Sequence, residues 1–294
     1  MKLNGRWGWW NQNHATSFDL PRMVQRAKDA RLAGIVIKYG YPQVERAFTA
    51  AGIPWAVERY VYIGQPEAEG QKLANAVDAG AVAAVINAEE GEGGWGPGIN
   101  TGPAMERLIA AFRARHPTVE LYASVDTRGD RLQHPYQQVL RRNIAGWLPM
   151  VYPKAFRPAC PAGFVAAAFR DCIDNRDFGG IPVYPTIQTY DEIGARYVEE
   201  QTGEVHRRGL TGYQADTIAH ATDAEWAAIV ADTPQEEAMP TAYGIIDLTA
   251  AECVPVIDAL EQVAVKADAE GNHVKAYLVR VFKARFQRVR DITS

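Results

Sequence analysis

The fold is organised around one stretch in which an apolar run breaks abruptly into acids and glycines, Val85-Ile86-Asn87-Ala88-Glu89-Glu90-Gly91-Glu92-Gly93-Gly94-Trp95. The apolar residues 82–86 predict a buried strand. The polar residues then form the loop at its C-terminal end, the edge where α/β folds carry ligand sites. Three carboxylates within four positions repel one another, which favours acid–base chemistry. A solvated acidic loop is the alternative interpretation.

The same pattern, an apolar strand that ends in polar side chains, recurs eight times before residue 232. The strands are expected at residues 6–11, 34–40, 54–62, 83–88, 119–126, 146–153, 181–190 and 209–216. Helical patterns lie between them, with Ser17 and Thr222 as expected N-caps. These helices are expected at residues 17–32, 44–51, 66–79, 101–116, 131–143, 161–173, 191–208 (in part) and 223–231.

Strands that alternate with helices imply βαβ units and a parallel sheet. Eight such units within residues 1–232 predict an α/β fold of the (β/α)₈ TIM-barrel type, whose usual length is about 250 residues. A doubly wound open sheet is the alternative. That fold usually has a glycine-rich, phosphate-binding loop after an early strand. The acids beside Gly91, Gly93 and Gly94 would instead repel a phosphate.

The remaining residues follow a different pattern. Pro234 and Pro240 mark a linker, and apolar stripes at helical spacing run through residues 249–267 and 274–290. We therefore expect a C-terminal helical extension over residues 241–294, with a strand at 276–282 as the alternative. The second helix is basic. Such a helix meets a membrane surface or a partner, including a second copy of the chain, or packs on the barrel with its charges solvated.

Composition narrows the function. The 294 residues are 47% hydrophobic, enough for a sizeable core, and the net charge of −4 argues against nucleic-acid binding. Cys160, Cys172 and Cys253 form no CxxC pair, and the six histidines form no HxH or HExxH pair, so no metal or other cofactor is expected. The N-terminus lacks the apolar core of a signal peptide, and no run is long enough to span a membrane. We therefore expect synthesis in the cytoplasm.

A barrel would bring the polar strand ends to one mouth. The candidate catalytic residues are Glu89, Glu90, Asp126 and Tyr152. The candidate substrate-binding residues are Trp9, Asn11, Lys38, Glu58, Asn87, Trp95, Gln188, Tyr190, Gln214 and Asp216. Acids, amides and aromatic rings together suit a carbohydrate. Ion pairs of Glu58 with Lys38 or Arg59, and of Asp126 with Arg128, are the structural alternatives.

Two short motifs carry a family resemblance. Asn87-Ala88-Glu89 resembles the Asp-x-Glu motif of the chitinase-like and family 25 lysozyme-like glycoside hydrolases, which are (β/α)₈ barrels. Met150-Val151-Tyr152 is similar to the Met-x-Tyr segment of the chitinase-like group. The resemblance implies that Glu89 is the general acid, that Asn87 holds the aspartate's place, and that Tyr152 steadies the reacting N-acetyl group.

The chain also departs from that pattern. Asn87 is an amide and cannot act as a base, Pro153 stands where the family has an aspartate, and residues 82–85 lack the earlier acids of the motif. Barrels of this kind resemble virion proteins of tailed phages as well, which by analogy implies assembly into a virion.

Three functions follow. A glycoside hydrolase acting on peptidoglycan or a chitin-type glycan would use Glu89 as its acid, with Asp126, Glu58 or Glu90 as the second carboxylate. A degenerate barrel would bind glycan without cleaving it, or serve as a structural virion protein whose C-terminal helices contact other virion proteins or itself. A metal-dependent hydrolase ranks last.

Overall fold

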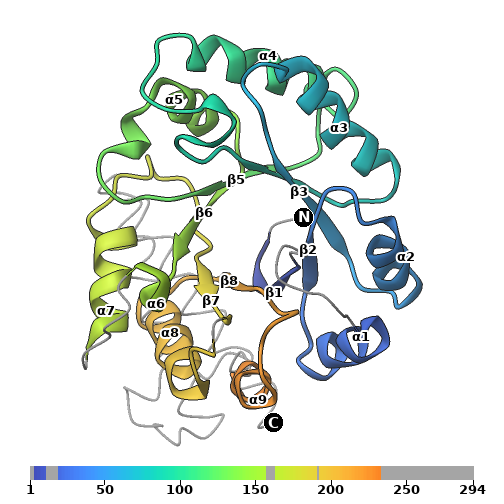
Figure 1. Cartoon of the computed structure of the whole chain (residues 1–294), viewed down its shortest axis with the longest axis vertical. Coiled ribbons are helices and arrows are strands. Elements are labelled where there is room, and N and C mark those ends of the chain that lie inside the picture. The colour runs from blue at the N-terminus through green and yellow to red at the C-terminus, as the bar shows by residue number, and fades with distance from the viewer. Residues whose placement is uncertain (1–2, 11–18, 157–162, 191, 233–294) are drawn as a thin grey trace, which may run out of the picture. The chain divides into compact units, whose positions relative to one another are not determined.

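The structure, a computed structural model, describes residues 3–10, 19–156, 163–190 and 192–232 (Figure 1). The chain divides into two compact units, Met1–Pro234 and Gln235–Ser294. The second unit lies outside the described residues, and with it the helical extension predicted over residues 241–294. Asn11 and Ser17 also lie outside them.

Eight parallel strands close into a barrel in chain order, which confirms the predicted (β/α)₈ fold (Figure 1). The barrel closes where β8 pairs with β1 and Gln214 lies opposite Trp7. The strands are β1 (Gly5–Trp10), β2 (Gly34–Lys38), β3 (Trp55–Tyr60), β4 (Ala84–Asn87), β5 (Leu121–Val125), β6 (Gly146–Val151), β7 (Thr186–Gln188) and β8 (Gly212–Asp216).

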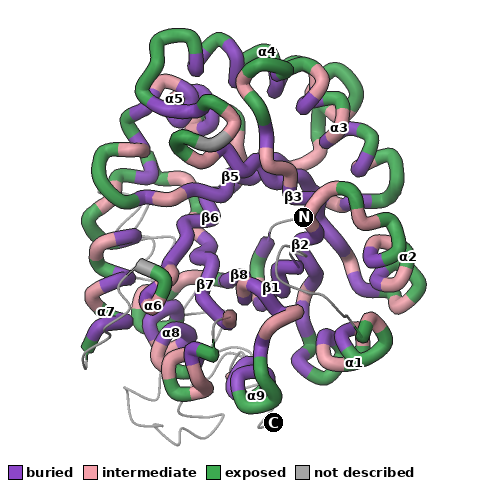
Figure 2. Tube along the Cα trace, in the orientation of Figure 1, coloured by how far each residue is buried: buried purple, intermediate pink, exposed green. Residues whose placement is uncertain are grey.

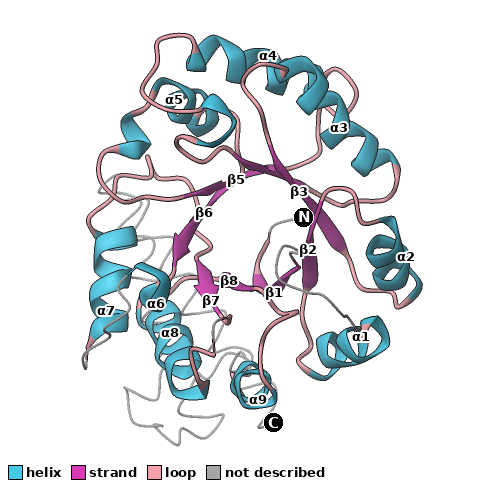
Figure 3. Cartoon of the chain, viewed as in Figure 1, coloured by secondary structure: helices cyan, strands magenta, loops and turns pink. Residues whose placement is uncertain are grey.

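The helices surround the strands as an outer layer (Figure 3). Several begin at proline, whose fixed φ and missing N–H suit the first helical turn; α9 begins with a capping box between Thr222 and Glu225. The helices are α1 (Leu20–Asp29), α2 (Pro42–Ala50), α3 (Pro66–Asp78), α4 (Thr101–Arg113), α5 (Pro135–Arg141), α6 (Pro153–Phe156), α7 (Phe164–Phe169), α8 (Ala195–Arg207) and α9 (Asp223–Ala231). No described helix is long and apolar enough to cross a bilayer.

For two of the predicted elements, proline explains the difference between prediction and structure. The strand expected at residues 181–190 is reduced to β7, because Pro182 and Pro185 have no N–H to donate to a neighbouring strand. The helix expected at residues 131–143 is a 3₁₀ turn, Arg131–Gln133, followed by α5. The break falls at His134, whose extended backbone (φ −61°, ψ 146°) is the conformation that a following proline favours.

The strands separate two apolar layers, because alternate side chains point to opposite faces. An inner cluster fills the barrel with side chains that include Trp7, Val36, Val85, Tyr122 and Leu148. The intervening residues pack outward against the helices, and the strands are buried almost throughout (Figure 2). Continuing the inner alternation toward the strand ends brings polar side chains of several strands to the C-terminal mouth.

Candidate active site

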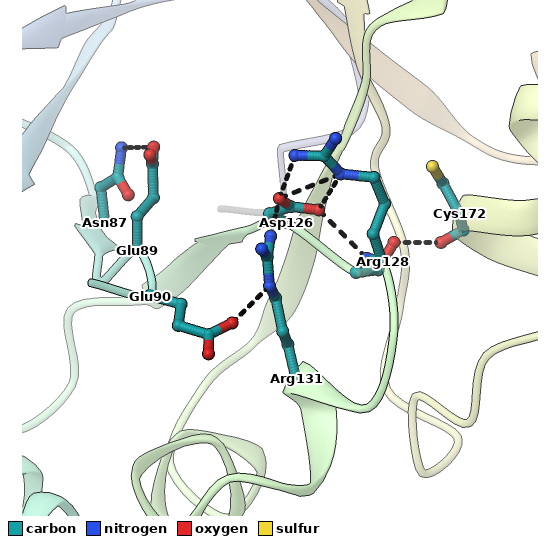
Figure 4. Close-up of polar contacts among 8 residues, drawn as sticks. Asn87, Glu89, Glu90, Asp126, Arg128, Arg131 and Cys172 are labelled. Atoms are coloured by element: carbon teal, nitrogen blue, oxygen red, sulfur yellow. Dashed lines mark hydrogen bonds and ion pairs between the residues drawn. The ribbon is translucent and has the colours of Figure 1, made fainter. Parts of the chain in front are cut away.

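Glu89 lies at the mouth, two residues beyond the inward-facing Asn87 that ends β4. Ala88 between them packs outward in the apolar layer, and Glu89 itself is partly exposed. The amide Nδ2 of Asn87 donates to Glu89 Oε1 over 3.0 Å, which orients the carboxylate (Figure 4). The charge of Glu89 also acts on Glu58, Tyr152 and Asp216. Groups from β3, β4, β6 and β8 therefore share Glu89 as a neighbour.

Glu58 is the most deeply buried acid of this group, with 3% of its surface exposed. Burial raises the pKa of Glu58 to about 7, while a hydrogen bond from Asn87 and the charge of Lys38 oppose the rise. Lys38 lies opposite Glu58 in the register of β2 and β3. Glu58 therefore exchanges its proton near neutral pH, within electrostatic reach of Glu89.

Tyr152 and Asp216 form a second polar pair across the mouth. The Tyr152 hydroxyl donates to Asp216 Oδ2 over 2.6 Å. Burial raises the pKa of Asp216 to about 7. The hydrogen bond from Tyr152 opposes this rise, and the negative charge of Glu89 adds to it. Burial and the charge of Asp216 hold the pKa of Tyr152 well above its usual value, so the phenol stays protonated. Tyr190 packs edge-on against Tyr152, with ring centroids 5.6 Å apart.

Glu90 and Asp126, both predicted as catalytic, lie in an ion network on the β5 side (Figure 4). Arg128 donates to both oxygens of Asp126, with Nε 2.9 Å from Oδ1 and Nη2 2.6 Å from Oδ2. Arg131 bridges the two acids, since it pairs with Asp126 and its Nε lies 2.6 Å from Glu90 Oε2. Two cations therefore compensate these carboxylates. This geometry matches the structural alternative, which paired Asp126 with Arg128.

Besides Glu58, four predicted substrate-binding residues are at most 4% exposed and are held by the barrel itself. Trp9 belongs to the inner apolar cluster. Trp95 folds back from the loop into the outer core, where its Nε1 donates to Val61 O over 2.8 Å. Gln188 Oε1 accepts from the backbone N–H of Lys154 at the start of α6, and Gln214 Oε1 accepts from Thr186. These side chains shape the barrel and present little surface to a ligand.

The inward alternation also brings two residues to the mouth that the sequence analysis did not single out, Tyr60 and Ser124. Each has a buried side-chain oxygen without a hydrogen-bond partner among the described residues. Counting back two positions from Asp126, which directly follows β5, would have indicated Ser124, because side chains two positions apart in a strand point to the same face. In the described part of the chain, no group of three or more His, Cys, Asp or Glu is arranged to hold a metal ion.

Comparison with known proteins identifies the fold. No protein-family model and no curated protein matches the sequence. Among solved structures, a chitinase from Chromobacterium violaceum matches with a TM-score of 0.55 and 12% identity, over 77% of this chain and 98% of that one. The chain has the fold of the glycoside hydrolase (β/α)₈ barrels.

Two further structures extend this likeness to enzymes with different names. The spore cortex-lytic enzyme SleL of Bacillus cereus matches with a TM-score of 0.57 and 8% identity, over 77% of this chain and 74% of that one. A β-glucanase from Saccharophagus degradans matches with a TM-score of 0.53 and 11% identity, over 77% and 86%. At these identities the likeness shows the fold, and the function has to be argued from the site.

Proposed function

We propose that the protein is a glycoside hydrolase that cleaves a peptidoglycan or chitin-type glycan, with Glu89 as the general acid. The observation that carries the proposal is the position of Glu89. It is partly exposed, it follows a barrel strand, and its charge reaches Glu58, Asp216 and Tyr152. Among the described residues, no arginine or lysine forms an ion pair with the Glu89 carboxylate of the kind that Arg131 forms with Glu90.

The chemistry follows from the geometry of the site. Glu89 would give its proton to the glycosidic oxygen as the bond from that oxygen to the anomeric carbon breaks. Water would add to the anomeric carbon and leave its proton on a carboxylate. Asp216 suits the role of second carboxylate, because it forms no ion pair with an arginine of the described residues and lies near enough to Glu89 to feel its charge. Tyr152, fixed by Asp216, would steady the reacting N-acetyl group, as the family resemblance implies.

The names of the structural neighbours support a glycan as the substrate. A chitinase, a spore cortex-lytic enzyme and a β-glucanase share this barrel. The name chitinase, together with the Asn87-Ala88-Glu89 and Met150-Val151-Tyr152 segments, favours an N-acetylated glycan over a plain glucan.

The test is release of reducing ends from chito-oligosaccharides and from peptidoglycan. Glu89→Gln should lose at least about 100-fold in rate, the range that general acid catalysis contributes. Glu90→Gln is the matched control: it is the adjacent acid and should keep most of the activity. Equal activity in Glu89→Gln and the wild type would remove Glu89 from the mechanism.

A glycan-binding barrel that no longer cleaves is the second candidate. It is favoured by Asn87, which cannot serve as a base where the resembling family has an aspartate, and by the ion pairs that compensate Asp126. Glycan binding by the wild type with no reducing ends released would establish it. Cytoplasmic synthesis, a place in a virion, and contacts of residues 241–294 with other virion proteins or a second copy of the chain remain proposals.

A further inference from the structure

Tyr62 is an exposed aromatic side chain on a firmly held backbone. Half of its surface, 50%, is exposed, just beyond the end of β3. Ile63 N–H donates to Gly93 O over 2.9 Å, and Gln65 N–H donates to Tyr62 O over 3.2 Å. Gly93 (φ +63°) lies so close that a Cβ there would sit 2.5 Å from Val61 O. The ring is therefore presented to solvent by a backbone that has little room to move.

Next to this ring begins a row of three polar atoms that have no hydrogen-bond partner among the described residues. Tyr60 packs edge-on against Tyr62, with centroids 5.9 Å apart. Tyr60 lies opposite Asn87, and Asn87 lies opposite Ser124, in neighbouring parallel strands about 4.8 Å apart. The Tyr60 hydroxyl, Asn87 Oδ1 and the Ser124 hydroxyl are buried, and the described residues offer none of them a partner. Buried polar atoms are usually hydrogen-bonded, so three in one row indicate a missing polar group.

The row and the ring adjoin the proposed acid. Tyr62 and Glu89 each stand two positions beyond a member of the row, Tyr60 and Asn87. The Nδ2 of Asn87 donates a hydrogen bond to Glu89, while its Oδ1 accepts none from the described residues. A polar group bound next to Glu89 would therefore lie beside these three atoms, and an apolar face of the same ligand could lie on the exposed Tyr62 ring.

We propose that Tyr62, with Tyr60, Asn87 and Ser124, forms a subsite for a second sugar ring beside Glu89, so that the ligand is an oligosaccharide and not a single terminal sugar. A pyranose has an apolar face for the Tyr62 ring. Its hydroxyls or acetamido N–H can donate to Asn87 Oδ1, and the two protein hydroxyls can donate or accept. The inference rests on the proposed glycan ligand, but it does not require cleavage.

The experiment is calorimetric titration of the Glu89→Gln chain with chito-oligosaccharides from the disaccharide to the tetrasaccharide, and with the matching cello-oligosaccharides. Tyr62→Ala in that background should weaken tetrasaccharide binding about 10-fold, the scale of one lost aromatic contact. Tyr62→Phe, which keeps the ring, should stay within about 3-fold of its parent. A melting temperature equal to that of the parent chain would exclude misfolding of an exposed substitution.

The outcomes separate this inference from the proposed function. Binding that strengthens with chain length and that Tyr62→Ala weakens about 10-fold supports the subsite, even if the wild type releases no reducing ends and the proposed function fails. Hydrolysis by the wild type with an unchanged KM and chain-length preference in Tyr62→Ala would overturn the subsite and leave the proposed function standing. Failure of every oligosaccharide in both series to bind the wild type or Glu89→Gln would also overturn the subsite.

Discussion

The protonation of Glu58 gives a stability prediction that can be worked from the structure. The pKa of Glu58 is raised from 4.5 to about 7 by burial, so the folded state holds a proton that the unfolded state releases. Folding stability from this group is therefore fully present below the unfolded pKa. It is lost as pH rises, until the folded state also ionises near pH 7.

The size of the effect follows from the linkage relation. Between pH 5 and pH 8, a carboxyl with these two pKa values lowers the free energy of unfolding by about 2.5 kcal/mol. Glu58→Gln replaces the acid with a neutral amide of nearly the same shape and has no proton to lose. The variant should therefore gain about 2.5 kcal/mol over the wild type as pH rises from 5 to 8, whatever offset separates the two at pH 5.

The assay is urea unfolding of the wild type and Glu58→Gln at pH 5, 6, 7 and 8. Glu67→Gln, on the exposed face of α3 with 54% of its side chain accessible, is the matched control and should parallel the wild type. If the curves for the wild type and Glu58→Gln run parallel across this range, Glu58 does not take up a proton on folding, and the electrostatic description of the mouth is wrong.

Four further substitutions test the packing and the polar pairs. Arg59→Met leaves the 1%-exposed Glu69 with Lys72 alone and should cost about 3 kcal/mol by thermal or urea unfolding. Trp95→Ala removes a buried ring from the outer core and should cost about 3–5 kcal/mol in the same assay, whereas a ligand-binding Trp95 would lose glycan affinity with little change in stability. Thr222→Ala breaks the capping box of α9 and should lower stability by about 1 kcal/mol, with Thr211→Ala on the surface as control. Tyr152→Phe removes the hydrogen bond to Asp216 and should lower kcat on an N-acetylated oligosaccharide at least about 10-fold, at a cost in stability of about 1–3 kcal/mol for the acceptor that loses its donor; an unchanged kcat would contradict its role.

The barrel was predictable because strand and helix periodicities are local properties of the sequence. Each apolar strand that ends in a polar residue places that residue at one edge of a parallel sheet. Glu58, Glu89, Tyr152 and Asp216 could be grouped in this way before any coordinates were known. The same alternation places Tyr60 and Ser124 on the inner face, but both are uncharged and each lies two positions from an acid, so the acids at the strand ends alone do not indicate them.

Other features depend on contacts between distant segments, which periodicity does not carry. Trp95 stands in a glycine-rich loop, yet the loop folds back so that its indole reaches Val61 O. Asp126 follows a strand as a catalytic acid would, yet Arg131 from the next turn bridges it to Glu90. Side-chain pairing across the mouth therefore determines which of the acids form ion pairs and which do not.

The most direct test of Glu89 as general acid compares two substrates with different leaving groups. A chito-oligosaccharide needs a proton on its departing oxygen, whereas the 2,4-dinitrophenyl glycoside of a chito-oligosaccharide does not. Glu89→Gln should lose at least about 100-fold in kcat/KM on the oligosaccharide and less than about 10-fold on the activated glycoside. Equal losses on the two substrates, or none on either, would contradict the assignment of Glu89 as the acid.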